Sequence, residues 1–202
     1  FGLEAVSAKS ITDAFPEDNG DIVLEVNSNG GLVTVGSEIY TALKSYSGNV
    51  TVEVTGMAAS AASVAIMGAD KVLISPTAQI MIHKALYGYV SGNSDDLDKA
   101  SNALKSSDKA IINAYVAKTG LSEEKILDMM RNETYMSASE AVEKGFADEV
   151  MSFDDVGAVA SLENGLLPQA VIDDFYANRS KRKSKIQNML REIEKEELLR
   201  GL

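Results

Sequence analysis

One serine and one histidine are the residues of this sequence best suited to hydrolytic chemistry. Ser60 stands in a run of small residues, 56–63 (GMAASAAS), where a strand-like segment meets a helix-like one. His83 is the only histidine in the chain of 202 residues, and it directly follows the apolar residues 80–82 (IMI). In serine hydrolases an imidazole takes the hydroxyl proton and later returns a proton to the leaving group. A serine hydrolase with a histidine base would therefore have a single candidate for that base.

Each of these residues also has a purely structural interpretation. A serine in an alanine-rich turn is commonly a helix N-cap, and a lone histidine beside an apolar strand is often structural. Ser63, one helical turn further on, is the nearest rival nucleophile. Lys71 or Lys84 would serve as the base in a serine–lysine peptidase. The glycine pair at residues 30–31 could direct a backbone N–H at a developing oxyanion, although two glycines also suit a tight turn.

Composition and charge exclude several other kinds of site. The chain has no cysteine, so it has no thiol nucleophile and no cysteine-based metal site, and one histidine is too few for a typical zinc site. No phosphate-binding motif of the Walker type occurs, so the chain itself should not hydrolyse ATP. We expect neither cofactor nor metal. The net charge of −11 disfavours nucleic acid. No apolar run reaches the ~18 residues of a membrane span, and residues 1–4 (FGLE) do not resemble a signal peptide, so we expect a cytoplasmic protein without a membrane partner.

Strand-like and helix-like segments alternate along the first three quarters of the chain. Four short apolar runs predict strands at residues 22–26, 50–54, 71–74 and 79–82. Helical spacing predicts helices at residues 35–46, from Ser60 to about 67, 94–118 (closed by Gly120), 121–130 and 138–144, the last with a capping box from Ser137 to Glu140. Alternation of this kind predicts an α/β fold with largely parallel strands.

The hydrophobic periodicity weakens after about residue 155, and the sequence becomes highly charged from residue 179 on. We therefore expect a catalytic domain over residues 1–155, a linker or arm over 156–178, and a charged amphipathic helix over 179–202. From Arg179 on there are eight basic and four acidic residues, so the tail is net positive although the whole chain is negative. The apolar stripe of this last segment suits either a solvated helix at the domain edge or a helix that docks on another chain.

Four segments, in order and with similar gaps, resemble the ClpP family of serine peptidases. Residues 27–31 (NSNGG) are similar to its "NSPGG" segment, with Asn29 where proline is usual, and residues 56–60 (GMAAS) to its "GQAAS" nucleophile segment. Residues 81–83 (MIH) and 135–145 (YMSASEAVEKG) resemble the family's "MIH" and "FLSAPEAVEYG" segments. Each segment alone is weak evidence for the family. The four segments in order, covering roughly residues 20–152, are a specific signal.

The resemblance implies both a fold and site roles. The family fold is a crotonase-like spiral of ββα units with a protruding handle helix, which residues 94–118 would form. Ser60 would be the nucleophile, His83 the base, and the backbone N–H groups of Gly31 and Ala61 the oxyanion hole. Residues 84–93 would line the substrate groove, where an extended peptide could add as a strand.

The acid of the triad is where the sequence departs from the family. An aspartate normally precedes the "FLSA" stretch, and Glu133 occupies the aligned position. A glutamate can orient an imidazole, although its longer side chain requires a shift of the backbone. Asp128 is the alternative acid, within a predicted helix, and Asp148 is expected to be a structural acid in a turn.

Other features resemble the phage and prophage branch of the family, whose members are thought to mature phage heads. Residues 58–64 (AASAASV) and 133–137 (ETYMS) are similar to motifs of that branch. The resemblance implies a homo-oligomeric ring that cleaves a capsid or scaffold protein, in the host cytoplasm or inside the procapsid. The N-terminal segment that contacts an unfolding ATPase in family rings is short or missing here, so we do not expect an ATPase partner.

Two other functions stay open from the sequence. The chain could be a catalytically weak or inactive ClpP-like assembly module, because of Glu133 and the charged tail. It could also be a crotonase-type acyl-CoA enzyme, because the fold is shared, although the usual catalytic carboxylates of those enzymes have no clear counterpart near the glycines. Cleavage specificity, subunit number and the activity of the isolated chain do not follow from the sequence.

Overall fold

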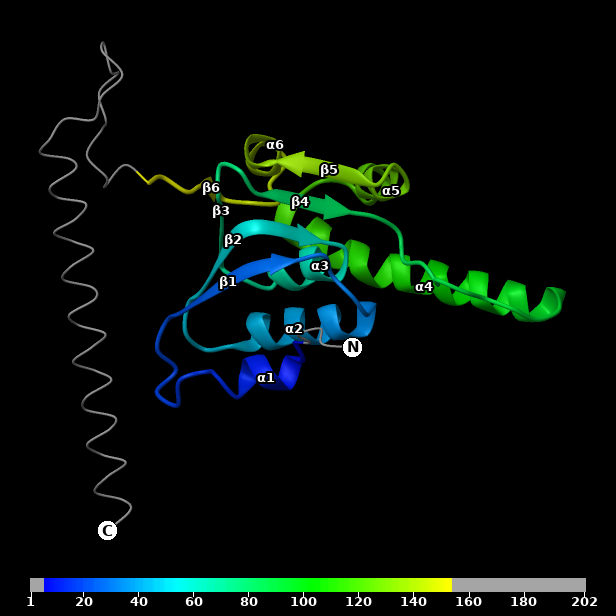
Figure 1. The fold of residues 1–202 in the computed structure, drawn as a ribbon, viewed down its shortest axis with the longest axis horizontal. Helices are drawn as coiled ribbons and strands as arrows, with labels where there is room; N and C mark the ends of the chain where they lie inside the picture. Colours follow the sequence, from blue (N-terminus) through cyan, green and yellow to red (C-terminus); the bar gives the residue numbers. More distant parts are fainter. Residues whose placement is uncertain (1–5, 154–202) are drawn as a thin grey trace, which may run out of the picture. The chain divides into compact units, whose positions relative to one another are not determined.

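A computed structural model of the protein describes residues 6–153, which form a mixed α/β fold (Figure 1). The α/β class expected from the alternating pattern is confirmed. The predicted linker over residues 156–178 and the predicted helix over 179–202 lie outside the described residues. Within residues 6–153, no helix combines the length and the apolar character needed to cross a bilayer.

The centre of the fold is a six-stranded sheet built around one long strand. The strands are β1 (Ile22–Ser28), β2 (Val50–Ala59), β3 (Lys71–Ile74), β4 (Gln79–Ile82), β5 (Thr134–Ser137) and β6 (Glu149–Val150). Strand β2 pairs in parallel with β1, β3 and β4, and β6 pairs in parallel with β3. Only β5 runs antiparallel, against β4. The expectation of largely parallel pairing therefore holds.

Strands β3 and β4 lie one after the other along the same side of β2. The first half of β2 pairs with β3 through residues 51–54, and its last residues, 57–59, pair with β4. A short turn at residues 75–78 is enough to join them, because the chain continues in the same direction. As a result, β2 and β4 end side by side, and the residues that follow both strands are brought together.

Within residues 6–153, six helices accompany this sheet. They are α1 (Ala8–Thr12), α2 (Val33–Ser45), α3 (Ala61–Ile66), α4 (Ser94–Thr119), α5 (Glu123–Arg131) and α6 (Ala138–Glu143). In Figure 1, α1 and α2 lie on one side of the sheet, and α5 and α6 flank β5. The predicted helix ends are also observed: Gly120 closes α4 with φ 71°, and the capping box from Ser137 to Glu140 begins α6.

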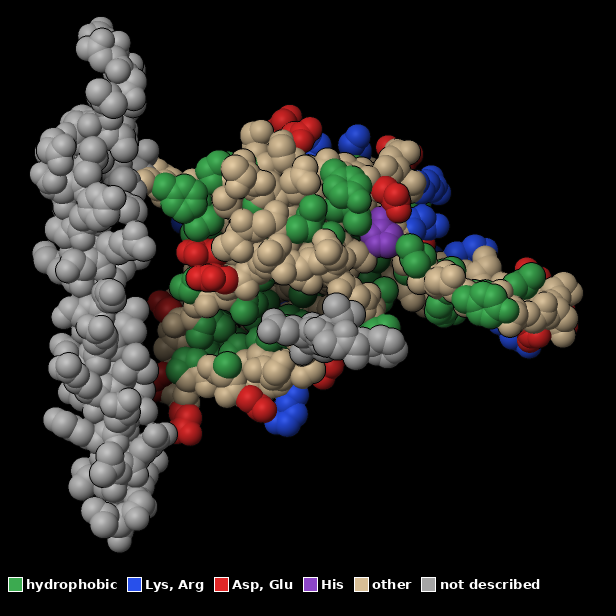
Figure 2. Space-filling view, viewed as in Figure 1, with side chains coloured by type: hydrophobic (Ala, Val, Ile, Leu, Met, Phe, Trp, Pro, Cys, Tyr) green, Lys and Arg blue, Asp and Glu red, His purple; other side chains and the backbone are tan. Residues whose placement is uncertain are grey.

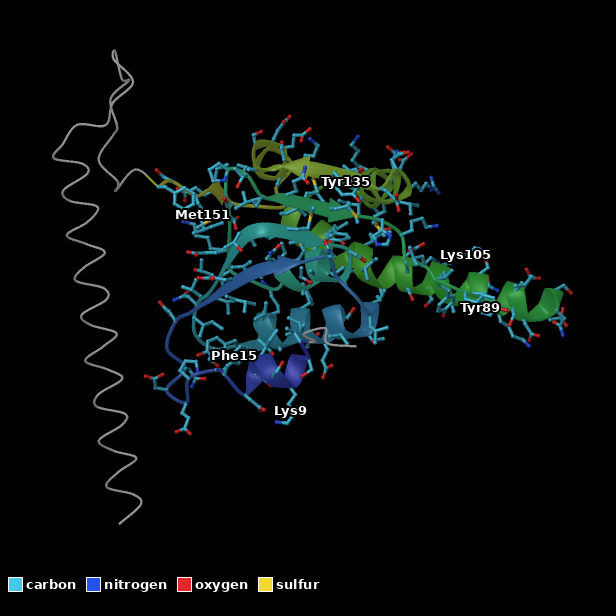
Figure 3. All side chains as sticks on the ribbon, viewed as in Figure 1. Lys9, Phe15, Tyr89, Lys105, Tyr135 and Met151 are labelled. Atoms are coloured by element: carbon cyan, nitrogen blue, oxygen red, sulfur yellow. The ribbon has the colours of Figure 1, made fainter. Side chains whose placement is uncertain are left out.

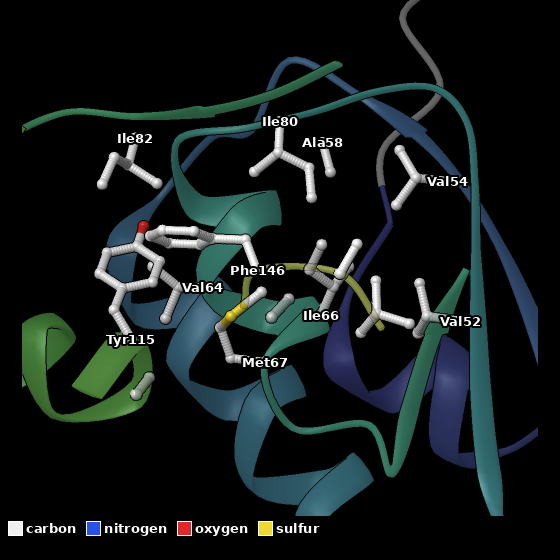
Figure 4. Packing of buried hydrophobic residues seen from close by; sticks show 14 of the residues in the cluster. Val52, Val54, Ala58, Val64, Ile66, Met67, Ile80, Ile82, Tyr115 and Phe146 are labelled. Carbon is white, nitrogen blue, oxygen red and sulfur yellow. The ribbon is translucent and has the colours of Figure 1, made fainter. Parts of the chain in front are cut away.

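The core lies between the sheet and its helices (Figure 4). Val52, Val54, Ile74 and Ile80 are fully buried, as expected for strands covered by helices on a parallel sheet. Tyr115 of α4 reaches into this core and packs at 5.6 Å, centroid to centroid, against Phe146.

The long helix α4 has two different halves. From residue 94 to 103 no side chain is buried, whereas Asp108, Ile111, Ile112, Ala114 and Tyr115 are buried in the second half. Figure 3 shows the first half extending away from the sheet, with Tyr89 lying beside it and Lys105 further along the helix. The second half is therefore the part of α4 that supports the rest of the fold.

The sequence missed three short elements. Strands β5 and β6 and helix α1 have four, two and five residues, too few for periodicity to reveal them. Strands β1 and β2 also run further than predicted, to Ser28 and Ala59. Apart from Met57, their extra residues are polar or small, and sheet pairing rather than local pattern determines where the strands end.

Candidate active site

Ser60 occupies a sharp turn between β2 and α3. Its backbone angles are φ 55° and ψ −123°, a conformation that a residue with a side chain rarely adopts. Ser60 stands at the N-cap position of α3, yet its hydroxyl makes no capping hydrogen bond. The usual structural role of a serine at this position is therefore absent, and the hydroxyl is directed elsewhere.

Several hydrogen bonds hold Ser60 in this conformation. Its N–H donates to the carbonyl of Met81 in β4 at 2.9 Å. Its carbonyl accepts from the Oγ of Ser63 at 2.6 Å and from the backbone N–H of Ser63 at 3.0 Å. The strained turn is thus fixed from both its amide and its carbonyl side.

His83 follows the end of β4 and meets Ser60 across the edge of the sheet. The Nε2 atom of His83 lies 2.7 Å from the Oγ of Ser60, which is hydrogen-bond distance. If Nδ1 carries the proton, Nε2 is free to accept the hydroxyl proton of Ser60. Figure 2 shows the imidazole at the molecular surface, beside apolar side chains. Both residues are half-buried, so substrate could reach them.

The rival nucleophile and the rival bases are occupied in other ways. Ser63 is fully buried, and its Oγ also lies 2.8 Å from the hydroxyl of Tyr115. Lys84 forms an ion pair with buried Asp108 at 3.0 Å. Lys71 pairs with Glu149 at 2.9 Å on the surface. Within the described part of the chain, His83 forms a hydrogen bond with the Ser60 hydroxyl, and none of these three residues does.

The glycine pair lies against the turn at Ser60. Gly30 has φ 94°, and a Cβ atom there would lie 2.8 Å from the Cβ of Ser60 and 2.9 Å from the nitrogen of Ala61. The close approach therefore requires glycine at position 30. Within residues 6–153, the N–H groups of Gly31 and Ala61 donate to no protein acceptor. Both are available for an oxyanion.

The register of β4 and β5 brings Glu133 opposite His83. Ile82 pairs with Thr134, so the next pair along the two antiparallel strands would be His83 and Glu133. Glu133 has φ 45° and an exposed side chain. Among the described residues no hydrogen bond joins its carboxylate to His83, so its role as the triad acid stays a prediction.

The two other acids considered from the sequence lie in structural settings. Asp128 is exposed on α5, as the predicted helix implied. The carboxylate of Asp148 accepts from the backbone N–H of Val72 and from Lys118, both at 2.6 Å. These contacts fix β6 beside β3, which is a structural role of the kind expected for Asp148.

A cavity of about 130 Å³ opens beside Ser60 and His83. Its other lining residues are mainly small or apolar and come from the glycine turn, α3, the segment after His83 and α4: Gly31, Val33, Ala61, Val64, Lys84, Ala85, Leu86, Ile111 and Tyr115. No cluster of three or more potential ligands within residues 6–153 could hold a metal ion. The site therefore combines a candidate nucleophile, a candidate base and an apolar recess.

Comparison with known proteins gives the family. Residues 11–154 match the family model described as Clp protease. The chain belongs to the Clp protease family. It is 34% identical over 168 residues to the ATP-dependent Clp protease proteolytic subunit 1 of Chlamydia trachomatis serovar D, covering 77% of this chain and 88% of that protein. The similarly named protein of Chlamydia muridarum is 37% identical over the same shares.

A more distant bacterium gives a similar result. The ATP-dependent Clp protease proteolytic subunit of Deinococcus radiodurans is 34% identical over 134 residues, covering 65% of each chain. These relatives support the family expected from the four sequence segments. The names of these relatives do not refer to phage head maturation.

Sequence reasoning missed two residues that support the site. Tyr115 braces Ser63, and Asp108 holds the segment after His83 by accepting from the N–H of Ala85 at 2.8 Å. Both stand on the buried face of α4, seven residues apart. An acidic side chain in helical register with Ile111 was the available signal, because a carboxylate on an apolar face needs a buried partner.

Proposed function

We propose that this chain is a serine endopeptidase in which Ser60 is the nucleophile and His83 the general base. The observation that carries the proposal is the distance of 2.7 Å between Oγ of Ser60 and Nε2 of His83. The backbone conformation of Ser60 supports it, because strained residues in well-braced turns are typical of functional sites. Membership of the Clp protease family supports the same chemistry.

The proposed reaction proceeds in two halves. Nε2 of His83 takes the proton of Ser60 as Oγ attacks the carbonyl carbon of a peptide bond. The N–H groups of Gly31 and Ala61 donate to the oxyanion, and the imidazolium then protonates the leaving amine. Water, deprotonated by the same imidazole, hydrolyses the resulting acyl-enzyme and restores the Ser60 hydroxyl.

Glu133 is the proposed third member of the triad. An acid that accepts from Nδ1 of His83 would fix the tautomer with Nε2 free and would stabilise the imidazolium. The strand register that faces Glu133 toward position 83 supports this role. The proposal requires the exposed glutamate side chain to turn toward the imidazole.

We further propose that the natural substrate is a capsid or scaffold polypeptide and that the active form is a homo-oligomeric ring. The motifs at residues 58–64 and 133–137, similar to the phage branch, support the substrate, and family membership supports the ring. The expected absence of an ATPase partner stays a prediction, set against relatives whose names call them ATP-dependent.

Active-site labelling tests the enzymatic proposal. The full chain, at several concentrations that favour assembly, is treated with a fluorophosphonate, and the adduct is located by peptide mapping. We expect the label on Ser60 and none on Ser63, and a His83→Ala variant should label far more slowly. Labelling that survives in the His83→Ala variant would favour a lysine base, and no label on Ser60 in any assembly state would contradict the proposal.

One observation favours a second candidate, an assembly module with weak activity. Glu133 is exposed and, within the described residues, makes no hydrogen bond to His83. Comparing capsid assembly with wild-type chain and with a Ser60→Ala variant separates the two functions. Normal heads and normal processing with the variant would support the assembly role, whereas blocked maturation would support the peptidase.

A further inference from the structure

The cavity beside Ser60 contains a charged wall residue that its apolar lining does not explain. Apart from His83, Lys84 is the one lining residue that normally carries a charge among those described. A free ammonium here would attract acidic side chains of a substrate and disfavour apolar or basic ones. Whether the charge of Lys84 is neutralised therefore affects which peptides the site accepts.

A buried carboxylate neutralises that charge. Oδ2 of Asp108 lies 3.0 Å from Nζ of Lys84, and the Asp108 side chain is only 6% exposed. The Lys84 side chain is 41% exposed, so solvent screens the pair on one side. Because the two charges are so close together, their electric fields largely cancel at the position of a side chain bound in the cavity.

Backbone contacts fix the position of both partners. Oδ1 of Asp108 accepts from the N–H of Ala85 at 2.8 Å, and the N–H of Lys84 donates to the carbonyl of Met130 at 3.3 Å. Asp108 also stands one helical turn before Ile111, which lines the cavity. The carboxylate is thus held beside the cavity wall.

We propose that Asp108 is a specificity-determining residue: by pairing with Lys84 it keeps the substrate cavity electrically neutral, so that the cavity selects apolar side chains. This inference rests on the proposed peptidase function. Removing the carboxylate exposes the lysine charge and admits acidic side chains. Removing the lysine leaves the carboxylate and admits basic ones.

The test uses three fluorogenic peptides that differ only in the residue whose carbonyl is cleaved, namely leucine, glutamate or lysine. An Asp108→Asn variant retains an oxygen that can accept from Ala85 while losing the charge. We expect its ratio of kcat/KM for the glutamate peptide to that for the leucine peptide to rise about fivefold, the scale of a partly exposed charge pair. The reciprocal variant, Lys84→Met, should raise the lysine-to-leucine ratio by a similar factor.

Two further variants complete the design. The double variant Asp108→Asn/Lys84→Met has lost both charges, so both ratios should return to the wild-type values. The exposed pair of Lys71 and Glu149 is the matched control, and Glu149→Gln should change neither ratio. A general disturbance of the fold would lower kcat/KM for all three peptides and would not move the ratios in opposite directions.

The outcomes separate this inference from the function on which it rests. Unchanged ratios in active, folded single variants would overturn the role of Asp108 alone. If Asp108→Asn does not fold, Lys84→Met still decides, because it leaves the Asp108 contact to Ala85 in place. A wild-type chain that cleaves none of the peptides in any assembly state would overturn the peptidase function and this inference together.

Discussion

Ser60 and Glu133 both adopt a positive φ, 55° and 45°, but their surroundings differ. Ser60 is half-buried and is held by Met81 and Ser63 through hydrogen bonds at both ends of the residue. Glu133 lies at an exposed turn, where its N–H makes a long hydrogen bond of 3.4 Å to the carbonyl of Met130. The proposed nucleophile is positioned by the core, whereas the proposed acid is positioned by a turn at the surface.

This difference indicates that the turn at Ser60 is rigid before substrate binds and that the Glu133 side chain is not. The cost of a positive φ, of order 1–3 kcal/mol, is borne only where the surroundings determine the conformation. At Ser60, the hydrogen bonds to Met81 and to buried Ser63 fix the backbone conformation. At Glu133 the side chain keeps its rotational freedom, so completing the triad costs conformational entropy that the pair of Ser60 and His83 has already lost.

The largest expected effect comes from removing the nucleophile. Ser60→Ala should lower kcat for peptide cleavage by about 10⁴-fold or more, because the oxyanion hole and binding alone leave only residual catalysis. Peptide hydrolysis by the purified full chain measures this effect. Ser63→Ala is the control, since it keeps the hydroxyl at position 60, and cleavage that resists Ser60→Ala but is lost in Ser63→Ala would reverse the assignment.

The next largest effect should come from the acid. Glu133→Gln should lower kcat by about 10²-fold or more, because an amide does not stabilise the imidazolium and can favour the wrong tautomer. Asp128→Asn, an equal loss of charge on α5, should leave kcat within about twofold. If Asp128→Asn proves the damaging change, Asp128 is the acid; if neither matters, the site acts as a pair.

The sequence predicts the positions of Ser60 and His83 better than that of Glu133. Ser60 and His83 each follow a strand with a strong apolar pattern, so the parallel arrangement alone places them at one edge of the sheet. Glu133 precedes a four-residue strand that no periodicity revealed, and only the family resemblance singled it out. Asp108 and Tyr115 act through contacts 23 and 52 residues away in sequence, which depend on how α4 packs.

The buried support of Ser60 should matter less than the acid does. Ser63→Ala leaves the Tyr115 hydroxyl without its partner in the core, so the free energy of unfolding should fall by about 1–3 kcal/mol. Adding Tyr115→Phe should cost less in the Ser63→Ala background than in wild type, because the two hydroxyls depend on each other. Urea unfolding of wild type and the three variants gives the coupling free energy, and additive losses would mean that the hydrogen bond contributes nothing to holding the turn.

Alkaline pH tests the contribution of the buried Tyr115 hydroxyl, which forms a hydrogen bond with Ser63. Burial raises the pKa of Tyr115 well above its usual value, partly opposed by its hydrogen bond with the Ser63 side chain. The unfolded chain therefore releases this proton at about pH 10, while the folded chain keeps it, and stability should fall as pH rises beyond that value. Unfolding at pH 8 and 11 should show a smaller loss in Tyr115→Phe than in wild type. The exposed Tyr135→Phe control should keep the wild-type slope.

The smallest expected effect separates strain from chemistry at Glu133. Glu133→Gly relieves the positive φ but makes the unfolded chain more flexible, so we expect a net gain in the free energy of unfolding of about 0.5–1 kcal/mol. The same variant should lose activity as Glu133→Gln does, because the carboxylate is gone. Asp128→Gly, in a helix, should instead lose about 1 kcal/mol. Thermal and urea unfolding measure these shifts, and a Glu133→Gly variant that is destabilised would show that surface contacts of the side chain, rather than the proposed catalytic role, explain a glutamate at this turn.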